Sequence, residues 1–434
     1  MKKLESAPVW HHTKLFDEAK KYSSDQNVEQ QVDKINEEYL YWDKVKYYNQ
    51  VISPELLWAR VKISRVINAR KLYFGETRFI FNLTNSLQRS LHEFDLHIGG
   101  NLGSSKLIPE NDKKKYLVSS IMEEAIASSQ IEGAVTTRKH AKEMLRKGIK
   151  PKNKSEQMIF NNYATIRNIV ETKNAELTMD QLLYIHRLIV DQTLEDQADE
   201  GKFRTDNDVN VVDVLNGEVV HIPPDFKLLP VRMQELIAFC NDESDDHFIH
   251  PIVKACIIHF MIGYLHPFVD GNGRTARALF YWYLLKKGYW LTEFLSISRL
   301  IVKTKVQYAD AFLYTETDDN DLTYFIKYNL KVMQLAYQEL KQYIERKITE
   351  GKKLLDFQKI DGVNQRQASI IKWIYDEPDL LFSVKEIENR MSVSNQTART
   401  DLDGLVEFGF LQKTSLNKKV KAYHKAPTFD ELVQ

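Results

Sequence analysis

The stretch HPFVDGNGRTAR, residues 266–277, gathers a histidine, a carboxylate, two glycines around an amide, and two arginines into one short segment. Apolar runs flank it, IVKACIIHFMIGYL before and ALFYWYLLKKG after, and both predict helices. Charged side chains and glycines make a poor core. The stretch therefore predicts a functional loop between two buried helices, in a mainly α fold.

The spacing inside this loop predicts an anion site at a helix N-terminus. Gly271 and Gly273 accept backbone conformations that other residues resist, so consecutive N–H groups can face one side. A helix that begins near Asn272 adds its unpaired N–H groups and the positive end of its dipole. Arg274 and Arg277 lie on one face of that helix, and their forked donors suit a chain of phosphates.

Two further side chains of the loop indicate the chemistry. Asp270 is a hard oxygen ligand beside the anion site, where Mg²⁺ commonly bridges a nucleotide. His266 ends the preceding helix, and its ordinary pKa near neutrality lets it accept a proton from an incoming hydroxyl. Together these groups predict nucleotidyl or phosphoryl transfer.

The same segment resembles the core motif of the Fic family, HxFx(D/E)GNGRxxR. Every defined position is matched, by His266, Phe268, Asp270, Gly271, Asn272, Gly273, Arg274 and Arg277. The resemblance implies a Fic-type helical bundle with a β-hairpin flap. It also implies a transferase that moves AMP from ATP to a Ser, Thr or Tyr hydroxyl of a target protein or of itself.

The resemblance also implies a role for each residue of the motif. His266 would be the general base, Phe268 would pack into the core, and Asp270 would hold Mg²⁺. Asn272 and the loop amides would hold the α-phosphate, and the two arginines would hold the outer phosphates. Related sites transfer other phosphate-containing groups, so the donor stays open.

An upstream helix, predicted over about residues 116–133, carries a second motif. Ser128, Glu132 and Gly133 match the (S/T)xxxE(G/N) signature of the inhibitory helix of Fic proteins, and Gly133 suits a helix end. The resemblance implies that Glu132 pairs with Arg277, occupies the donor that the γ-phosphate needs, and makes ATP bind unproductively. Two alternatives remain: Glu132 forms an ordinary solvated salt bridge, or it orients a water molecule for removal of AMP.

The run VNVVDVLNGEVVHIPP predicts a β-hairpin over about residues 209–224. Asn216-Gly217 between two short apolar segments is a strong signal for a tight hairpin turn. The hairpin resembles the flap of Fic proteins, in which Val219, Val220 and His221 would align a target segment by main-chain pairing. A purely structural hairpin is the alternative.

The remaining sequence predicts flanking regions. Residues 1–110 read as a helical accessory region, with apolar periodicity predicting helices over 56–74 and 79–94. The Fic domain would occupy 111–348, and a polar, glycine-broken segment predicts a linker over 349–364.

Residues 365–427 predict three helices followed by a small hairpin, an order that resembles a winged-helix (α+β) domain. The third helix would then enter a DNA groove. It carries Asp401, Asp403 and Glu407 against Arg399, which disfavours a surface lined by phosphates. Protein interaction is therefore the favoured use of this domain, and DNA is the alternative.

The composition limits the kinds of partner and the cellular location that we expect for this protein. The formal net charge is zero, which gives no bulk attraction to nucleic acid or to a membrane surface. The two cysteines, the absence of an apolar leader and the absence of a spanning run predict a cytoplasmic protein, with a homodimer as a possible assembly. Two function classes compete, an adenylyltransferase and a winged-helix regulator that senses nucleotide. Intact His266 and Asp270 favour the enzyme.

Overall fold

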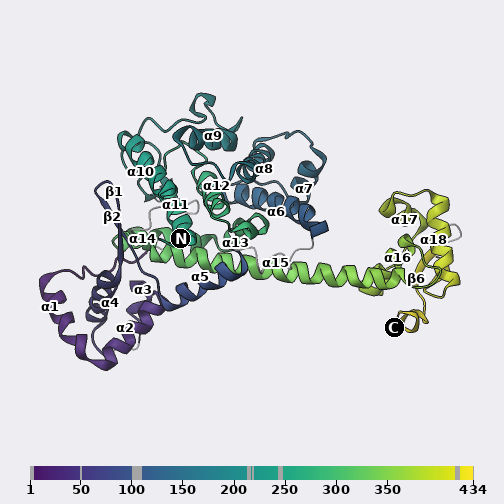
Figure 1. The fold of residues 1–434 in the computed structure, drawn as a ribbon, viewed down its shortest axis with the longest axis horizontal. Coiled ribbons are helices and arrows are strands. Elements are labelled where there is room, and N and C mark those ends of the chain that lie inside the picture. The colour runs from purple at the N-terminus through teal and green to yellow at the C-terminus, as the bar shows by residue number, and fades with distance from the viewer. Residues whose placement is uncertain are drawn as a thin grey trace. The chain divides into compact units, whose positions relative to one another are not determined.

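The computed structural model describes residues 4–48, 51–99, 110–212, 217, 219–242, 248–415 and 421–433. The chain divides into two compact units, Met1–Leu340 and Lys341–Gln434. Helices dominate both units (Figure 1), and the described strands form two-stranded antiparallel hairpins. The predicted mainly α fold is confirmed. Within the described ranges, every helix falls short of the length or the hydropathy that crossing a bilayer requires.

The N-terminal part of the first unit packs short helices around an aromatic core. The helices are α1 (Thr13–Lys21), α2 (Gln26–Glu38), α3 (Trp42–Val45), α4 (Pro54–Asn68) and α5 (Asn85–His97). Helix α4 begins at a cap, because Ser53 Oγ accepts a hydrogen bond from Leu56 N at 3.3 Å. Its buried face carries Leu57, Trp58 and Val61, which join the core that α2 and α3 complete.

A β-hairpin interrupts this part where the sequence predicted helix. Strands β1 (Arg70–Phe74) and β2 (Thr77–Phe81) pair in antiparallel register, so the helices predicted over 56–74 and 79–94 were wrong at these ends. Gly75 turns the chain with a φ of +57°, which L residues rarely adopt. The aromatic residues on either side favour strands, and burial of the second strand outweighs the helical periodicity.

The rest of the first unit surrounds one helix that is apolar on all sides. In chain order it contains α6 (Glu110–Ile131), α7 (Arg138–Lys147), α8 (Lys154–Thr172), α9 (Met179–Val190), α10 (Leu229–Asn241), α11 (Pro251–Leu265), α12 (Asn272–Lys286), α13 (Ile297–Lys303) and α14 (Lys305–Thr317). Almost every residue of α11 is buried, as expected for a helix enclosed by others. Helix α12 packs against it, so the motif loop joins two core helices (Figure 1).

Hydrogen bonds to the buried Glu124 side chain hold helix α6 against this core. Glu124 accepts hydrogen bonds from Tyr281 Oη of α12 at 2.9 Å and from Ser298 N of α13 at 3.0 Å. Ser296 Oγ donates a further bond at 3.1 Å. These contacts fix the helix that carries Glu132 relative to the motif loop.

The predicted flap hairpin is present as two short strands. Val211 of β3 (Val211–Val212) lies opposite His221 of β4 (Val219–His221). Gly217 has a φ of +69°, in keeping with a tight turn, while Asn216 lies outside the described residues.

Helix α15 (Thr323–Gln358) extends further than the sequence predicted. The helical region was expected to end at 348, with a linker over 349–364, but the helix continues for ten residues more. One internal glycine costs a helix only about 1 kcal/mol. Phe357, at the end of the helix, is buried in the core of the second unit, and such packing offsets that cost.

The second unit has the predicted order of three helices and a hairpin. It contains α16 (Gln365–Asp376), α17 (Val384–Met391), α18 (Asn395–Glu407), β5 (Leu411–Ser415), β6 (Lys421–Lys425) and α19 (Phe429–Leu432). Tyr423 of β6 also bridges to Phe382 in antiparallel sense.

The acids of α18 are used inside this unit. Asp401 is buried and accepts bonds from Arg366 Nε at 2.6 Å and Asn364 Nδ2 at 2.9 Å. Asp403 pairs with Lys413 and accepts from Tyr423 Oη. The sequence argument that α18 presents three acids to a partner was therefore wrong for Asp401, whereas the Asp403 side chain stays 37% exposed beside Lys413.

Candidate functional site

The motif loop holds itself in one conformation. Asn272 Oδ1 accepts from Phe268 N at 2.9 Å, and Asn272 Nδ2 donates to Phe268 O at 2.7 Å. Both ends of the Asn272 amide thus close the loop, and its backbone N–H lies at the start of α12, so its contact with an α-phosphate stays a prediction. Gly271 has a φ of +86°, and a Cβ there would press on Val190, so glycine is required.

The buried side chain of His186 packs against the motif loop and holds it by a hydrogen bond. The His186 ring stacks on Phe268 with centroids 3.7 Å apart. Gly201 N donates to His186 Nδ1 at 3.1 Å, and the opposite nitrogen donates to Asp270 O at 2.9 Å. Burial lowers the pKa of His186 to about 4, so the ring stays neutral and keeps this tautomer. Sequence reasoning missed His186, because its partner in the loop is 84 residues away.

His266 has the geometry of a base. It ends α11 with a φ of +46°, and its Nδ1 lies 3.2 Å from Gly263 O. A carbonyl oxygen only accepts, so Nδ1 carries the hydrogen and Nε2 carries the lone pair of the neutral ring. Burial lowers the pKa of His266, which keeps the ring neutral at pH 7.

Asp270 and Arg274 form a connected pair. Arg274 Nη2 lies 3.4 Å from Asp270 Oδ1, and Arg274 Nη1 donates to Ile189 O at 3.0 Å. The arginine side chain is fully buried, whereas that of Asp270 is 42% exposed. Arg274 Nε is buried and has no hydrogen-bond partner in the described part of the chain. Arg274, a predicted phosphate ligand, thus uses one nitrogen on the loop and one on the carbonyl oxygen of Ile189 in α9, and its Nε stays unsatisfied.

Asp270 stands without companion metal ligands. Across the described ranges, no group of three or more His, Cys, Asp or Glu side chains is placed to hold a metal. A Mg²⁺ ion held by one carboxylate and by nucleotide phosphates needs no such group. The partly exposed Asp270 carboxylate fits that mode of binding.

Arg277 is held by the upstream helix α6. Its Nη2 donates to Glu132 Oε1 at 2.9 Å and to Ser128 O at 3.0 Å, and its Nε donates to Ser128 Oγ at 2.9 Å. The arginine side chain is 1% exposed and that of Glu132 is 29% exposed. Burial alone would lower the pKa of Arg277, but Glu132 offsets this effect and the pKa is raised. Nη1 stays buried without a well-aligned partner among the described residues.

Glu132 also lies against the turn that begins α12. A methyl group added at Gly273 would overlap Glu132 Oε1. Gly273 has no positive φ, so its predicted conformational role was wrong, and what the site requires is its lack of a side chain. Gly133 ends α6 with a φ of +93°, which turns the chain directly after the acid. A carboxylate oxygen therefore occupies the space beside an unsatisfied arginine nitrogen and a helix N-terminus.

The flap is tied to the base by an arginine. Arg204 Nε donates to His266 O at 3.0 Å, Nη1 donates to Asp206 O at 2.6 Å, and Nη2 donates to Pro224 O. Asp206 and Pro224 lie on either side of the hairpin. Sequence reasoning missed Arg204, because nothing local distinguishes it from a surface arginine.

The three flap residues differ in exposure. Val219 is 53% exposed, Val220 is half-buried, and the side chain of His221 is 9% exposed. Of these three residues of the strand, Val219 is thus the most exposed to solvent and His221 has a buried side chain.

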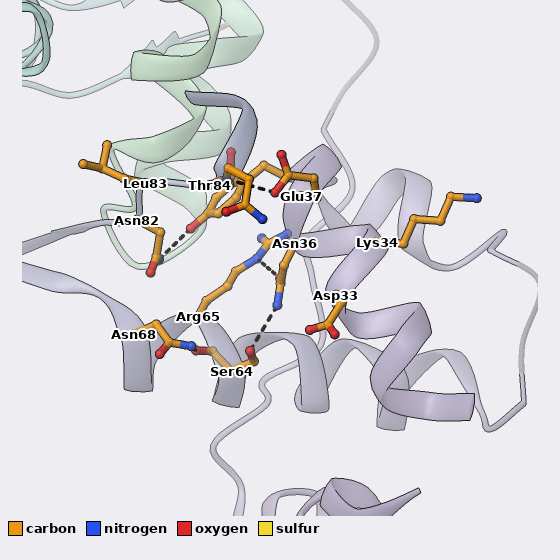
Figure 2. A pocket seen from close by; sticks show the side chains of 12 residues that line it. Asp33, Lys34, Asn36, Glu37, Ser64, Arg65, Asn68, Asn82, Leu83 and Thr84 are labelled. Carbon is orange, nitrogen blue, oxygen red and sulfur yellow. Dashed lines mark hydrogen bonds between the residues drawn. The ribbon is translucent and has the colours of Figure 1, made fainter. Parts of the chain in front are cut away.

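A separate hollow lies in the N-terminal part of the first unit, and Figure 2 shows it. It has a volume of about 630 Å³ and is lined mostly by polar residues of α2, α4 and the segment before α5. Arg65 Nε donates to Asn36 Oδ1 at 2.9 Å, and Asn36 Nδ2 donates to Ser64 Oγ at 3.2 Å (Figure 2). Asn82 Nδ2 donates to Tyr39 Oη at 3.0 Å. These groups satisfy one another, and no motif residue lines the hollow, so we assign it to the scaffold.

Comparison with known proteins identifies relatives of the region around the loop. Residues 176–284 match the model of the Fic/DOC family. The protein adenylyltransferase Fic of Drosophila virilis is 35% identical over 114 residues, which are 26% of this chain and 21% of that protein. The protein adenylyltransferase fic-1 of Caenorhabditis elegans is 29% identical over 122 residues, which are 28% of this chain and 22% of that protein. The matched segment spans about a fifth of the length of these curated relatives.

Solved structures of similar chains cover more of the molecule. A Fic family protein from Desulfovibrio desulfuricans G20 aligns with a TM-score of 0.48 and 20% identity, over 79% of this chain and 95% of that chain. Fic-1 of C. elegans aligns with a TM-score of 0.48 and 19% identity, over 78% of this chain and 87% of that chain.

Proposed function

This chain is a Fic/DOC family protein related to protein adenylyltransferases, and on that premise we propose that it transfers AMP from ATP to a hydroxyl of a target protein or of itself. The hydroxyl oxygen forms a bond to the α-phosphorus, and the bond from that phosphorus to the bridging oxygen of the diphosphate breaks. Diphosphate leaves, and the hydroxyl proton goes to His266 Nε2.

The state of His266 supports its role as the base. Its Nδ1–H donates to Gly263 O, which fixes the ring and leaves Nε2 with the lone pair. The lowered pKa keeps that lone pair available at neutral pH. The contact from Arg204 to His266 O holds the backbone at this point.

The unsatisfied donors beside the loop support a polyphosphate ligand. Arg277 Nη1 and Arg274 Nε are buried without well-aligned partners among the described residues, and a buried unpaired donor is costly. The N-terminus of α12 adds backbone N–H groups next to them. Asp270 would hold a Mg²⁺ ion that neutralises charge on the phosphates.

The single observation that carries the proposal is the position of Glu132. Its Oε1 takes the place of an anionic oxygen, 2.9 Å from Arg277 Nη2 and against Gly273. A site that binds a carboxylate with these groups has the chemistry to bind a phosphate there. We infer that Glu132 is a brake, because the γ-phosphate of ATP and the carboxylate compete for one guanidinium.

The test is label transfer from ATP in the parent and in Glu132→Gly, with a cell lysate as the source of targets. Removal of the brake should raise transfer of α-labelled phosphate to protein about a hundredfold, the cost of misplacing a reacting group by about an ångström. γ-Labelled ATP should leave no label on protein. Label on protein from γ-labelled ATP, with none from α-labelled ATP, would indicate phosphoryl transfer and contradict the proposal.

Removal of AMP from a modified protein is the second candidate. The observation in its favour is that Glu132, besides pairing with Arg277, lies close enough to raise the pKa of His266, although burial dominates that pKa. A carboxylate so placed can orient a water molecule. If Glu132→Gly transferred no more AMP than the parent and lost the ability to release AMP from a modified protein, this candidate would replace the first.

A further inference from the structure

We propose that His221, Glu316 and the carbonyl of Tyr264 form a clasp that holds the flap strand on the catalytic helix and that opens when the shared proton is lost. His221 then acts as a positioning residue for transfer and sets the alkaline limit of activity. The proposal rests on the function proposed above, but part of its test does not depend on transfer.

The geometry of the His221 ring carries the argument. Nδ1 lies 2.6 Å from Glu316 Oε2, and Nε2 lies 2.8 Å from Tyr264 O. The carbonyl oxygen only accepts, so Nε2 must carry a hydrogen. Nδ1 and Glu316 Oε2 are only 2.6 Å apart, and without a hydrogen between them their lone pairs would repel. A second proton must therefore lie between these two atoms. The closed clasp therefore contains one proton more than a neutral ring beside an ionised acid.

The three partners come from three parts of the site. His221 ends the flap strand β4, Tyr264 lies on α11 two residues before His266, and Glu316 lies near the end of α14. The clasp thus ties the flap to the helix end that presents the base. Arg204 makes a second tie, from the base of the flap to His266 O, but a guanidinium does not titrate in this range.

The groups that face His221 define its titration. Burial would lower the pKa of His221, but the side chain of Glu316 and the carbonyl of Tyr264 outweigh burial and raise it. The Tyr264 ring also lies against it, with centroids 5.4 Å apart, and His266 lies close enough for the two histidines to interact electrostatically. A raised pKa means that the clasp is fully formed below the ordinary histidine value and is lost as pH rises through the raised value.

The two histidines therefore predict a bell-shaped dependence of the transfer rate on pH. The acid limb belongs to His266, whose pKa is lowered chiefly by burial, with a contribution from His221. The alkaline limb belongs to the clasp, whose opening frees the strand that aligns the target. The rate is highest between the two values.

The experiment compares pH–rate profiles of AMP transfer in the unbraked Glu132→Gly protein. Adding Glu316→Gln keeps an acceptor for Nδ1–H but removes the charge, so the alkaline limb should move to lower pH by about one unit. Adding His221→Gln keeps a donor for the Tyr264 carbonyl but cannot titrate, so this limb should disappear. The matched control is Asp95→Asn, which removes the carboxylate that faces His250 3.1 Å away and should leave the profile unchanged.

Proton NMR of the His221 ring is the readout that needs no transfer. The ring should titrate above the ordinary histidine value in the parent and nearer to it in Glu316→Gln, with the signal assigned by its loss in His221→Gln. A ring that titrates at or below its ordinary value with Glu316 intact, or an alkaline limb that both substitutions leave in place, would overturn the clasp. If no variant transfers AMP, the proposed function fails, and the NMR titration alone decides the clasp.

Discussion

Helices α12 and α18 both begin with polar residues and both bury charge, but they use it in opposite ways. In α12 the guanidinium of Arg277 is almost fully buried and leaves Nη1 unsatisfied, with Glu132 as its partner from a helix far upstream. In α18 both oxygens of Asp401 are occupied, by Arg366 and Asn364. Arg277 thus keeps a donor that a ligand can use, whereas both side-chain oxygens of Asp401 are bonded within the fold.

The difference shows why a count of charges along a helix is a poor guide to its partner. Such a count assigned α18 an acidic surface, yet Asp401 is buried, and Asp403, whose side chain is 37% exposed, pairs with Lys413. In α12 the two arginines that the sequence predicts as phosphate ligands are both buried, and each keeps one nitrogen without a hydrogen-bond partner among the described residues. What matters in both helices is which donors and acceptors remain unsatisfied after folding.

The largest effect is expected from the base beside α12. His266→Ala in the Glu132→Gly protein should lower AMP transfer by roughly a hundred- to ten-thousand-fold, because the hydroxyl loses its proton acceptor. The thermal unfolding midpoint should change little, since the ring makes one hydrogen bond in the described structure, to Gly263. Rates from α-labelled ATP and calorimetry of the same samples provide the measurement. A variant that kept most of its rate would contradict the assignment of the base.

A smaller effect is expected from a substitution in α18, which should change stability and leave AMP transfer unchanged. Asp401→Ala should lower the free energy of unfolding of the second unit by about 2 kcal/mol, because it leaves the Asn364 amide without its acceptor and removes the Arg366 pair, itself weakened by exposure. Hydrogen exchange of α16–α18 in the full chain measures this.

The matched control for that change is Glu407→Ala, an exposed acid on the same helix, which should have almost no effect on exchange. Transfer by the Glu132→Gly protein should be unaffected by either substitution. Equal protection in the two α18 variants would mean that Asp401 is as dispensable as a surface residue, and the contrast between the helices would fail.

How far the sequence predicted this structure depends on the distance between partners. The motif loop and the flap hairpin are local features, and their own residues predicted them. His186 and Arg204 support the loop across 84 and 62 residues, and no local pattern marks them. The hairpin at 70–81 and the length of α15 were missed for a related reason, since burial decided them against the local signals.

The brake is tested by the intact mass of the purified protein after incubation with Mg-ATP. Three samples are needed: the parent, Glu132→Gly, and Glu132→Gly with His266→Ala. We predict that Glu132→Gly gains the mass of one or more AMP groups, while the parent and the double variant gain little or none. A parent that acquires AMP as readily as Glu132→Gly would contradict the brake, and a double variant that does so would contradict the base.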